Sequence, residues 1–303
     1  MMNEINCTPP RAARKQQQGV VLLALVLVVL VGSTAVLLGK LNQRAQDYAR
    51  EVQTQAALRE ARNALIRFAV TYPETQDKPD RGPGYLPCPD QDEDGSAESD
   101  CAATTGSTLG LLPARDLGID TPVDSSGGRI WYAVAQEFKN NQPSSHVLNS
   151  ETRATLSVDV ADADDVVAVL IAAGSPVNGQ DDRDDAVADV ADDSKDWYEV
   201  ADEYLEDSNP TSTDEFYVTG PTVADSPPEC TDASLDADEV ELKCFNDQII
   251  TITRQELMAA VEARVANEVR AVLASYRDSA GGAFPWLVPF ADPKRGGRHA
   301  ASL

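Results

Sequence analysis

The sequence predicts an α+β protein with a long N-terminal helix, an antiparallel sheet and a C-terminal helix. Three observations support this fold class. An uncharged apolar run at 20–38 passes into a helical pattern that fades at Pro73. Short segments rich in β-branched residues follow, separated by Gly, Pro, Asn and Asp. Thr253 and Glu256 then have the spacing of a capping box, which opens a second helical pattern.

The apolar run has the length of a membrane-spanning helix. It carries no charged residue and would extend about 28 Å as a helix, near the hydrocarbon thickness of a bilayer. Three basic residues precede it, Arg11, Arg14 and Lys15. Acidic residues soon offset the basic ones that follow it, which slightly favours a cytoplasmic N-terminus. We therefore expect residues 20–39 to cross a membrane once.

The helical pattern continues after the run and becomes amphipathic over 40–72. Its apolar positions recur at steps of three and four toward the end: Leu58, Ala61, Leu65, Phe68 and Tyr72. Such steps place side chains on one helix face. This second half is expected to pack on a folded domain.

The boundary in front of the run carries a family resemblance. Residues 14–18 are polar and basic, Gly19 follows, and the chain becomes apolar at Val20. This resembles the leader of type IV prepilins and of type II secretion pseudopilins, and the resemblance covers residues 14–72. It implies that a prepilin peptidase removes residues 1–19 by cutting after Gly19. Val20 would then be the N-terminus, usually N-methylated. A plain signal-anchored protein is the alternative.

The chain departs from the family at the fifth mature position. Most pilins carry a glutamate there, whereas this chain has Ala24. The resemblance therefore implies a minor subunit at the tip or in the priming of a pilus or pseudopilus. Its partners would be other pilin or pseudopilin subunits, prepilin peptidase and the inner membrane. The alternative is an inner-membrane-anchored periplasmic binding or adhesion domain that does not assemble.

The rest of the chain is expected to form a pilin-like periplasmic domain. We assign 73–253 to a β-rich domain with acidic loops, 254–278 to the C-terminal helix and 279–303 to a Pro/aromatic segment and tail. Strands are predicted at 129–134, 155–160, 166–172, 216–219, 240–245 and 249–253. The continuous apolar run from Val166 predicts a central strand covered on both faces, while the other strands should alternate. Asn246-Asp247 is expected to form a hairpin turn.

The C-terminal helix shows an apolar stripe that we expect to be buried. Its members are Leu257, Val261, Val265, Val269, Val272 and Tyr276. The segment 284–290 contains three aromatic residues and two prolines. It is expected to cover the open end of the core, with a contact to a neighbouring subunit as the alternative.

Charge and motif content exclude several function classes. The chain has 25 Lys and Arg against 50 Asp and Glu, a net charge of -25. Such a surface repels the phosphate backbone, so nucleic-acid binding is not expected. The sequence has only two histidines and no nucleophile-elbow, P-loop or dinucleotide motif, so we do not expect an enzyme.

The cysteines suggest disulfides in an oxidising compartment. Four of them follow the apolar run: Cys88, Cys101, Cys230 and Cys244. Short separations favour Cys88–Cys101 and Cys230–Cys244, each closing a loop worth about 3 kcal/mol. Two other pairings are arithmetically possible, and zinc binding is a weaker alternative because no C-x-x-C spacing occurs.

One acidic segment has the pattern of a calcium loop. Asp90, Asp92, Asp94 and Gly95 match the first half of such a loop, but Cys101 stands at the position of the bidentate glutamate. Glu98 or Asp100 could complete the ligand shell, so calcium is the one cofactor considered. A solvated acidic loop is the alternative. A second acidic run from Asn178 is a weaker candidate.

Overall fold

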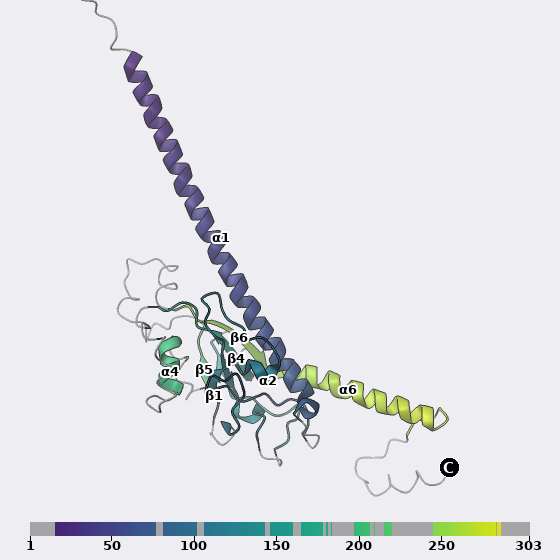
Figure 1. The fold of residues 1–303 in the computed structure, drawn as a ribbon. Coiled ribbons are helices and arrows are strands. Elements are labelled where there is room, and N and C mark those ends of the chain that lie inside the picture. Colours follow the sequence, from purple (N-terminus) through teal and green to yellow (C-terminus); the bar gives the residue numbers. More distant parts are fainter. Residues whose placement is uncertain are drawn as a thin grey trace, which may run out of the picture. The chain divides into compact units, whose positions relative to one another are not determined.

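The computed structural model shows a mixed α+β protein with an antiparallel sheet (Figure 1). The chain divides into two compact units, 1–53 and 54–303, and each is described by itself. The residues that the structure describes are 16–76, 81–101, 106–142, 146–159, 165–177, 180, 183, 197–206, 209, 215–219, 245–282, 284 and 285.

In the first unit the structure describes the start of helix α1, which spans Gln16–Thr75 in all. Every side chain described from 22 to 34 is exposed, for example Leu22 and Val28 at 69% each. Among the residues searched, no helix has a stretch both long and apolar enough to cross a membrane. The side chains of 20, 21 and 35–39 lie outside this description. The membrane segment at 20–39 therefore stays a prediction.

In the second unit, α1 supplies one wall of the core. Leu58, Ala61, Leu65 and Tyr72 are completely buried, which confirms the predicted stripe. The helix ends at Thr75 instead of Tyr72. Pro73 fits the last turn because the carbonyl of Ala69, which a helical N–H at that position would otherwise satisfy, accepts a hydrogen bond from Gly84 N at 2.8 Å.

Four strands form the main sheet, in the order β1-β2-β4-β6, and all three pairings are antiparallel. The bounds are Thr108–Leu111 for β1, Trp131–Val134 for β2, Val166–Ala172 for β4 and Gln248–Thr253 for β6. All seven residues of β4 are buried between β2 and β6, which confirms the predicted central strand. Two short strands, β3 at Ser157–Val158 and β5 at Phe216–Tyr217, pair in parallel as a second sheet.

One prediction about the strands was wrong, and one strand was missed. All four residues of β2 are buried instead of alternating. The reason is a second cover: helix α4, Trp197–Tyr204, lies against β1, and the Tyr204 ring packs 5.5 Å from that of Trp131. Strand β1 was not predicted at all. Residues 240–244 of another predicted strand lie outside the described residues, so the Asn246-Asp247 hairpin stays untested.

Two short elements lie in the connections, helix α2 at Ala114–Leu117 and the 3-10 turn η2 at Gln136–Phe138. The C-terminal helix α6, Arg254–Ser279, follows β6 directly. The capping box of Thr253 and Glu256 is present at the start of α6, as predicted. After the helix the backbone turns at Gly281 and Gly282, which both have positive φ angles.

The predicted stripe of α6 is buried only at its beginning. Leu257 and Val261 belong to the core, as does Met258 beside them. Val265, Val269, Val272 and Tyr276 are 42–69% exposed, so the expectation that they are buried was wrong. The core ends at Val261, whereas α6 runs on past it (Figure 1). Phe284 is also exposed, and residues 286–290 lie outside the described part of the chain.

Candidate metal centre and a buried charged cluster

The acidic loop that begins at Asp90 is anchored to the edge strand β1. Asp90 N donates to Leu111 O at 2.9 Å, and Leu111 N donates to Asp90 O at 2.8 Å. Gln91 Nε2 donates to Leu109 O at 2.8 Å. Gly110 permits this approach, because a Cβ there would lie 2.8 Å from Asp90 O. The edge strand β1 therefore fixes the position of the loop relative to the sheet.

Successive aspartates shape the loop through backbone hydrogen bonds. Asp90 Oδ2 accepts from Gly95 N at 2.9 Å, and Asp90 Oδ1 accepts from Asp92 N at 3.3 Å. Asp92 Oδ1 accepts from Asp94 N at 3.2 Å. Gly95 has a φ of 82°, a conformation that favours glycine. The D-x-D-x-D-G pattern thus produces a tight turn, as the sequence suggested.

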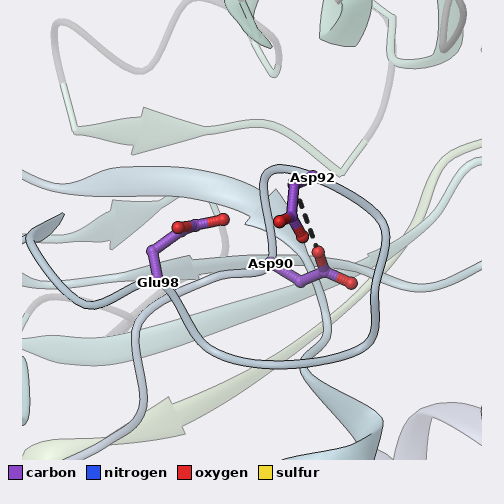
Figure 2. Close-up of side chains that lie close together, drawn as sticks. All are labelled: Asp90, Asp92 and Glu98. Carbon is purple, nitrogen blue, oxygen red and sulfur yellow. Dashed lines mark hydrogen bonds between the residues drawn. The ribbon is translucent and has the colours of Figure 1, made fainter. Parts of the chain in front are cut away.

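Three carboxyl groups meet at this turn. Asp90, Asp92 and Glu98 each offer an oxygen, and these oxygens all lie within 4.8 Å of one another (Figure 2). Calcium binds oxygens at about 2.3–2.6 Å, so ligands on opposite sides of one ion are about 5 Å apart. The spacing and the hard oxygen donors therefore fit a calcium ion.

Electrostatics show that negative charge is crowded here. Burial raises the pKa of Glu98, and the charges of Asp92, Asp90 and Asp100 raise it further. Burial also raises the pKa of Asp90, although hydrogen bonds and Arg129 oppose the shift. A bound cation would relieve this crowding.

Arginines already neutralise part of the loop. Arg129 lies 3.3 Å from both Asp90 and Glu93, and Arg115 lies 3.6 Å from Asp94. Asp94 therefore faces Arg115, and neither it nor the exposed Asp100 joins the group of three. Within the described ranges, Asp92 and Glu98 form no ion pair.

The loop is closed by a disulfide between Cys88 and Cys101, whose Cα atoms are 5.8 Å apart. Both cysteines are buried. Next to the bridge, the buried Lys139 donates to Cys101 O at 2.9 Å and to Gly106 O at 2.7 Å, and burial lowers its pKa to about 8. Cys230 and Cys244 lie outside the described residues, so their pairing stays a prediction.

The predicted processing residues lie in the first unit. Gly19 and Val20 are part of α1, and their side chains are outside the description. Ala24 is in the same helix and is exposed. The acidic residues of the second candidate loop, 181–196, also lie outside the described residues.

A buried charged cluster at the end of the sheet was not predicted. Its carboxyl groups belong to Glu206, which follows α4, and Asp247, which precedes β6, and each residue is 6% exposed. Asp247 Oδ2 accepts from Glu206 N at 3.1 Å and from Asn209 Nδ2 at 2.8 Å. Glu206 Oε2 accepts from Asp247 N at 3.0 Å. The two acidic side chains therefore bind each other's backbone.

Arg183 supplies the positive charge of this cluster. It is 8% exposed, and its Nη2 lies 3.8 Å from Glu206 Oε1. Its guanidinium also donates to Gly174 O at 2.8 Å and to Tyr204 O at 2.9 Å, and it stacks over the Tyr204 ring. Arg183 thus joins the end of β4 to the end of α4. The only sign of this cluster in the sequence was a single arginine within a run of aspartates, and the run suggested a solvated acidic loop instead of a buried ion pair.

The paired carboxyl groups should make stability depend on pH. Burial raises the pKa of Asp247 well above its usual value, and the charge of Glu206 adds to this; burial also raises the pKa of Glu206. The folded state therefore holds a proton that the unfolded state releases at ordinary carboxyl pKa values. Stability contributed by this proton is present at low pH and is lost as pH rises through the raised pKa values.

Replacing Asp247 with Asn should remove this loss, because a neutral amide has no proton to lose and places no second negative charge beside the buried Glu206. We expect Asp247→Asn to be more stable than the parent chain at pH 8 and nearly equal at pH 5. Urea unfolding at both pH values measures this. The exposed Asp120→Asn serves as the charge-matched control. Equal pH profiles for the parent and Asp247→Asn would rule out a raised pKa of Asp247 as the source of the pH dependence.

Comparisons of the chain with protein-family models, with curated proteins and with solved structures found no match.

Proposed function

We propose that this protein is a membrane-anchored minor pilin or pseudopilin that takes part in the tip or the priming of a type IV pilus or type II secretion pseudopilus. The observation that carries the proposal is the apolar surface of the first unit. Large apolar side chains from Leu22 to Val31 are 50–69% exposed on all sides of α1. Exposed apolar surface of this extent needs a cover, and a bilayer or the helices of neighbouring subunits would provide one.

The leader supports the same proposal. The change from a basic, polar segment to an apolar one occurs between Gly19 and Val20, as in the leaders that prepilin peptidase removes. Cleavage there would leave the apolar segment at the mature N-terminus. The folded second unit would then lie in the periplasm, where a disulfide such as Cys88–Cys101 is stable.

Ala24 supports a minor role over a shaft-forming one. Most pilins carry a glutamate at this position, and a carboxylate buried among apolar helices is tolerable only when a charged group of a neighbouring subunit pairs with it. Ala24 carries no carboxylate and cannot form this pair. The same feature favours the second candidate, a periplasmic binding or adhesion domain that stays anchored. Processing separates them: the pilin function requires a mature chain that starts at Val20, and mass spectrometry of the chain from cells with active prepilin peptidase measures it.

We propose calcium as the ligand of the acidic loop, with Asp90, Asp92 and Glu98 as its protein ligands. Binding to the folded state alone would stabilise it by about 3 kcal/mol at a calcium concentration 100 times the Kd. We therefore expect the melting temperature of the chain to rise by several degrees in millimolar calcium over the same chain with chelator. Differential scanning calorimetry measures the shift.

The matched variants for this prediction are Asp92→Asn and Asp120→Asn. Asp92 belongs to the group of three and is exposed enough for its substitution to leave the fold intact, whereas Asp120 is an exposed aspartate outside the loop. The calcium shift should shrink strongly in Asp92→Asn and persist in Asp120→Asn. An unchanged melting temperature of the parent chain between calcium and chelator would refute the site.

A further inference from the structure

The face of α6 that enters the core continues beyond it as an exposed apolar row. Leu257, Met258 and Val261 are buried on this face. The next four members are exposed: Val265 at 42%, Val269 at 52%, Val272 at 69% and Tyr276 at 44%. We call these four residues the α6 stripe. Their spacing of four, three and four keeps them on one side of the helix.

The α6 stripe is unusual for an exposed surface. Single exposed apolar side chains are common, but a contiguous row that extends a core face marks an interaction surface. The positions beside and behind the row are charged: Glu262, Glu268, Arg270 and Arg277. An apolar centre with a charged rim is typical of protein interfaces.

We propose that the α6 stripe binds the same stripe of a second copy of this chain, with the two helices antiparallel. The stripe is complementary to itself in this arrangement. A register that sets Val265 opposite Tyr276 of the second copy also sets Val269 opposite Val272, and the two-fold axis repeats both contacts. All four apolar side chains of each copy are then covered by apolar side chains of the other.

The charges beside the stripe are complementary in the antiparallel arrangement. At about 100° per residue, Glu262 and Arg277 lie on the same flank of the stripe. An antiparallel pair sets the same flank of both helices side by side, so this register brings Glu262 of one copy toward Arg277 of the other. Arg277 also contacts its neighbour Asp278 at 2.9 Å, in an exposed pair that contributes little. On the other flank, Glu268 is paired with Arg264 at 2.6 Å.

A different occupant of this face would be the end of the same chain. Phe284 lies beside α6 at a hollow of about 370 Å³ whose lining includes Ala266, Val269 and Leu273. This hollow adjoins the stripe, so residues 286–303 are the competing occupant. The charge pairing and the self-matching register favour the second copy. This self-association is independent of the proposed function, because it requires neither processing nor a filament.

Cross-linking in membranes of the full chain tests the direction of pairing. Two differently tagged chains, one with Val269→Cys and one with Val272→Cys, are co-expressed and mildly oxidised, with the parent chain as background for its own cysteines. Random pairing of the two co-expressed chains would give a mixed product about twice each like-with-like product. The antiparallel register predicts that the mixed 269–272 product exceeds this random ratio several-fold. A mixed product at or below the random ratio would overturn the proposal.

Analytical ultracentrifugation of the full chain in detergent tests the stripe itself. The parent chain should dimerise, and Val269→Glu should weaken the dimer by about tenfold or more, because it buries an unpaired charge against Val272 of the second copy in an apolar contact. Ala263→Glu, on the exposed opposite face of α6, should leave it unchanged. A parent chain that is monomeric at every concentration overturns the proposal. If removal of residues 286–303 then produces the dimer, the chain's own end is the occupant.

Discussion

Replacing Arg183 with Met should lower the free energy of unfolding by about 3–5 kcal/mol, the cost of removing one partner from a buried ion pair. The substitution leaves the buried Glu206 without its cation and removes the donor to the carbonyls of Gly174 and Tyr204. Met has a similar apolar stem, so the lost charge and hydrogen bonds account for the effect. Urea unfolding of the full chain in detergent at pH 7 measures it.

Arg153→Met is the matched control for this prediction. Arg153 also forms an ion pair, with Asp165 at 3.0 Å, but its side chain is 76% exposed. Exposed pairs contribute little, so the control should change the free energy of unfolding by less than about 1 kcal/mol. Equal effects of the two substitutions would show that Arg183 does not hold the end of β4 to α4.

Replacing both Cys88 and Cys101 with Ser should lower the free energy of unfolding by about 3 kcal/mol, because the unfolded chain gains the freedom of the opened loop. The bridge spans 13 residues and encloses the acidic loop. Its loss should also weaken the proposed calcium binding, since Glu98 would no longer be held opposite Asp90 and Asp92. Urea unfolding and calcium titration of the double variant measure the two effects.

Cys7→Ser is the control for the double variant, because Cys7 precedes the apolar run and is expected on the cytoplasmic side. It should change neither measurement. A double variant as stable as the parent chain would contradict the disulfide. Unchanged stability together with free thiols at both positions in the parent protein would also contradict the proposed periplasmic location.

The elements of the fold were predictable where the pattern was local. The α1 stripe at Leu58 and Leu65, the buried run of β4 and the capping box at Thr253 each follow from neighbouring residues. Which parts of an apolar helix face are covered by the core was not predictable in the same way. Periodicity places Val269 on the core face of α6, but it cannot say that the core ends at Val261.

The candidate sites differ in the same respect: one follows a local sequence pattern, and the other joins residues that are distant in the sequence. The acidic loop was visible because its aspartates lie at alternate positions, and Asp90 and Asp92 do converge. The sequence could not show that Asp94 turns to Arg115. The buried cluster of Arg183, Glu206 and Asp247 joins residues far apart in the chain, and no local pattern distinguishes its carboxylates from the many exposed ones.

The mass of the mature N-terminal peptide shows whether prepilin peptidase processes this chain, as we propose. Gly19→Ala is compared with Gly32→Ala in cells with active prepilin peptidase. Gly32 lies in the same apolar segment, and a Cβ there would meet nothing within 4 Å. The parent chain and Gly32→Ala should start at Val20 with a methylated amine, while Gly19→Ala should retain residues 1–19. A parent chain that retains residues 1–19 would contradict the account.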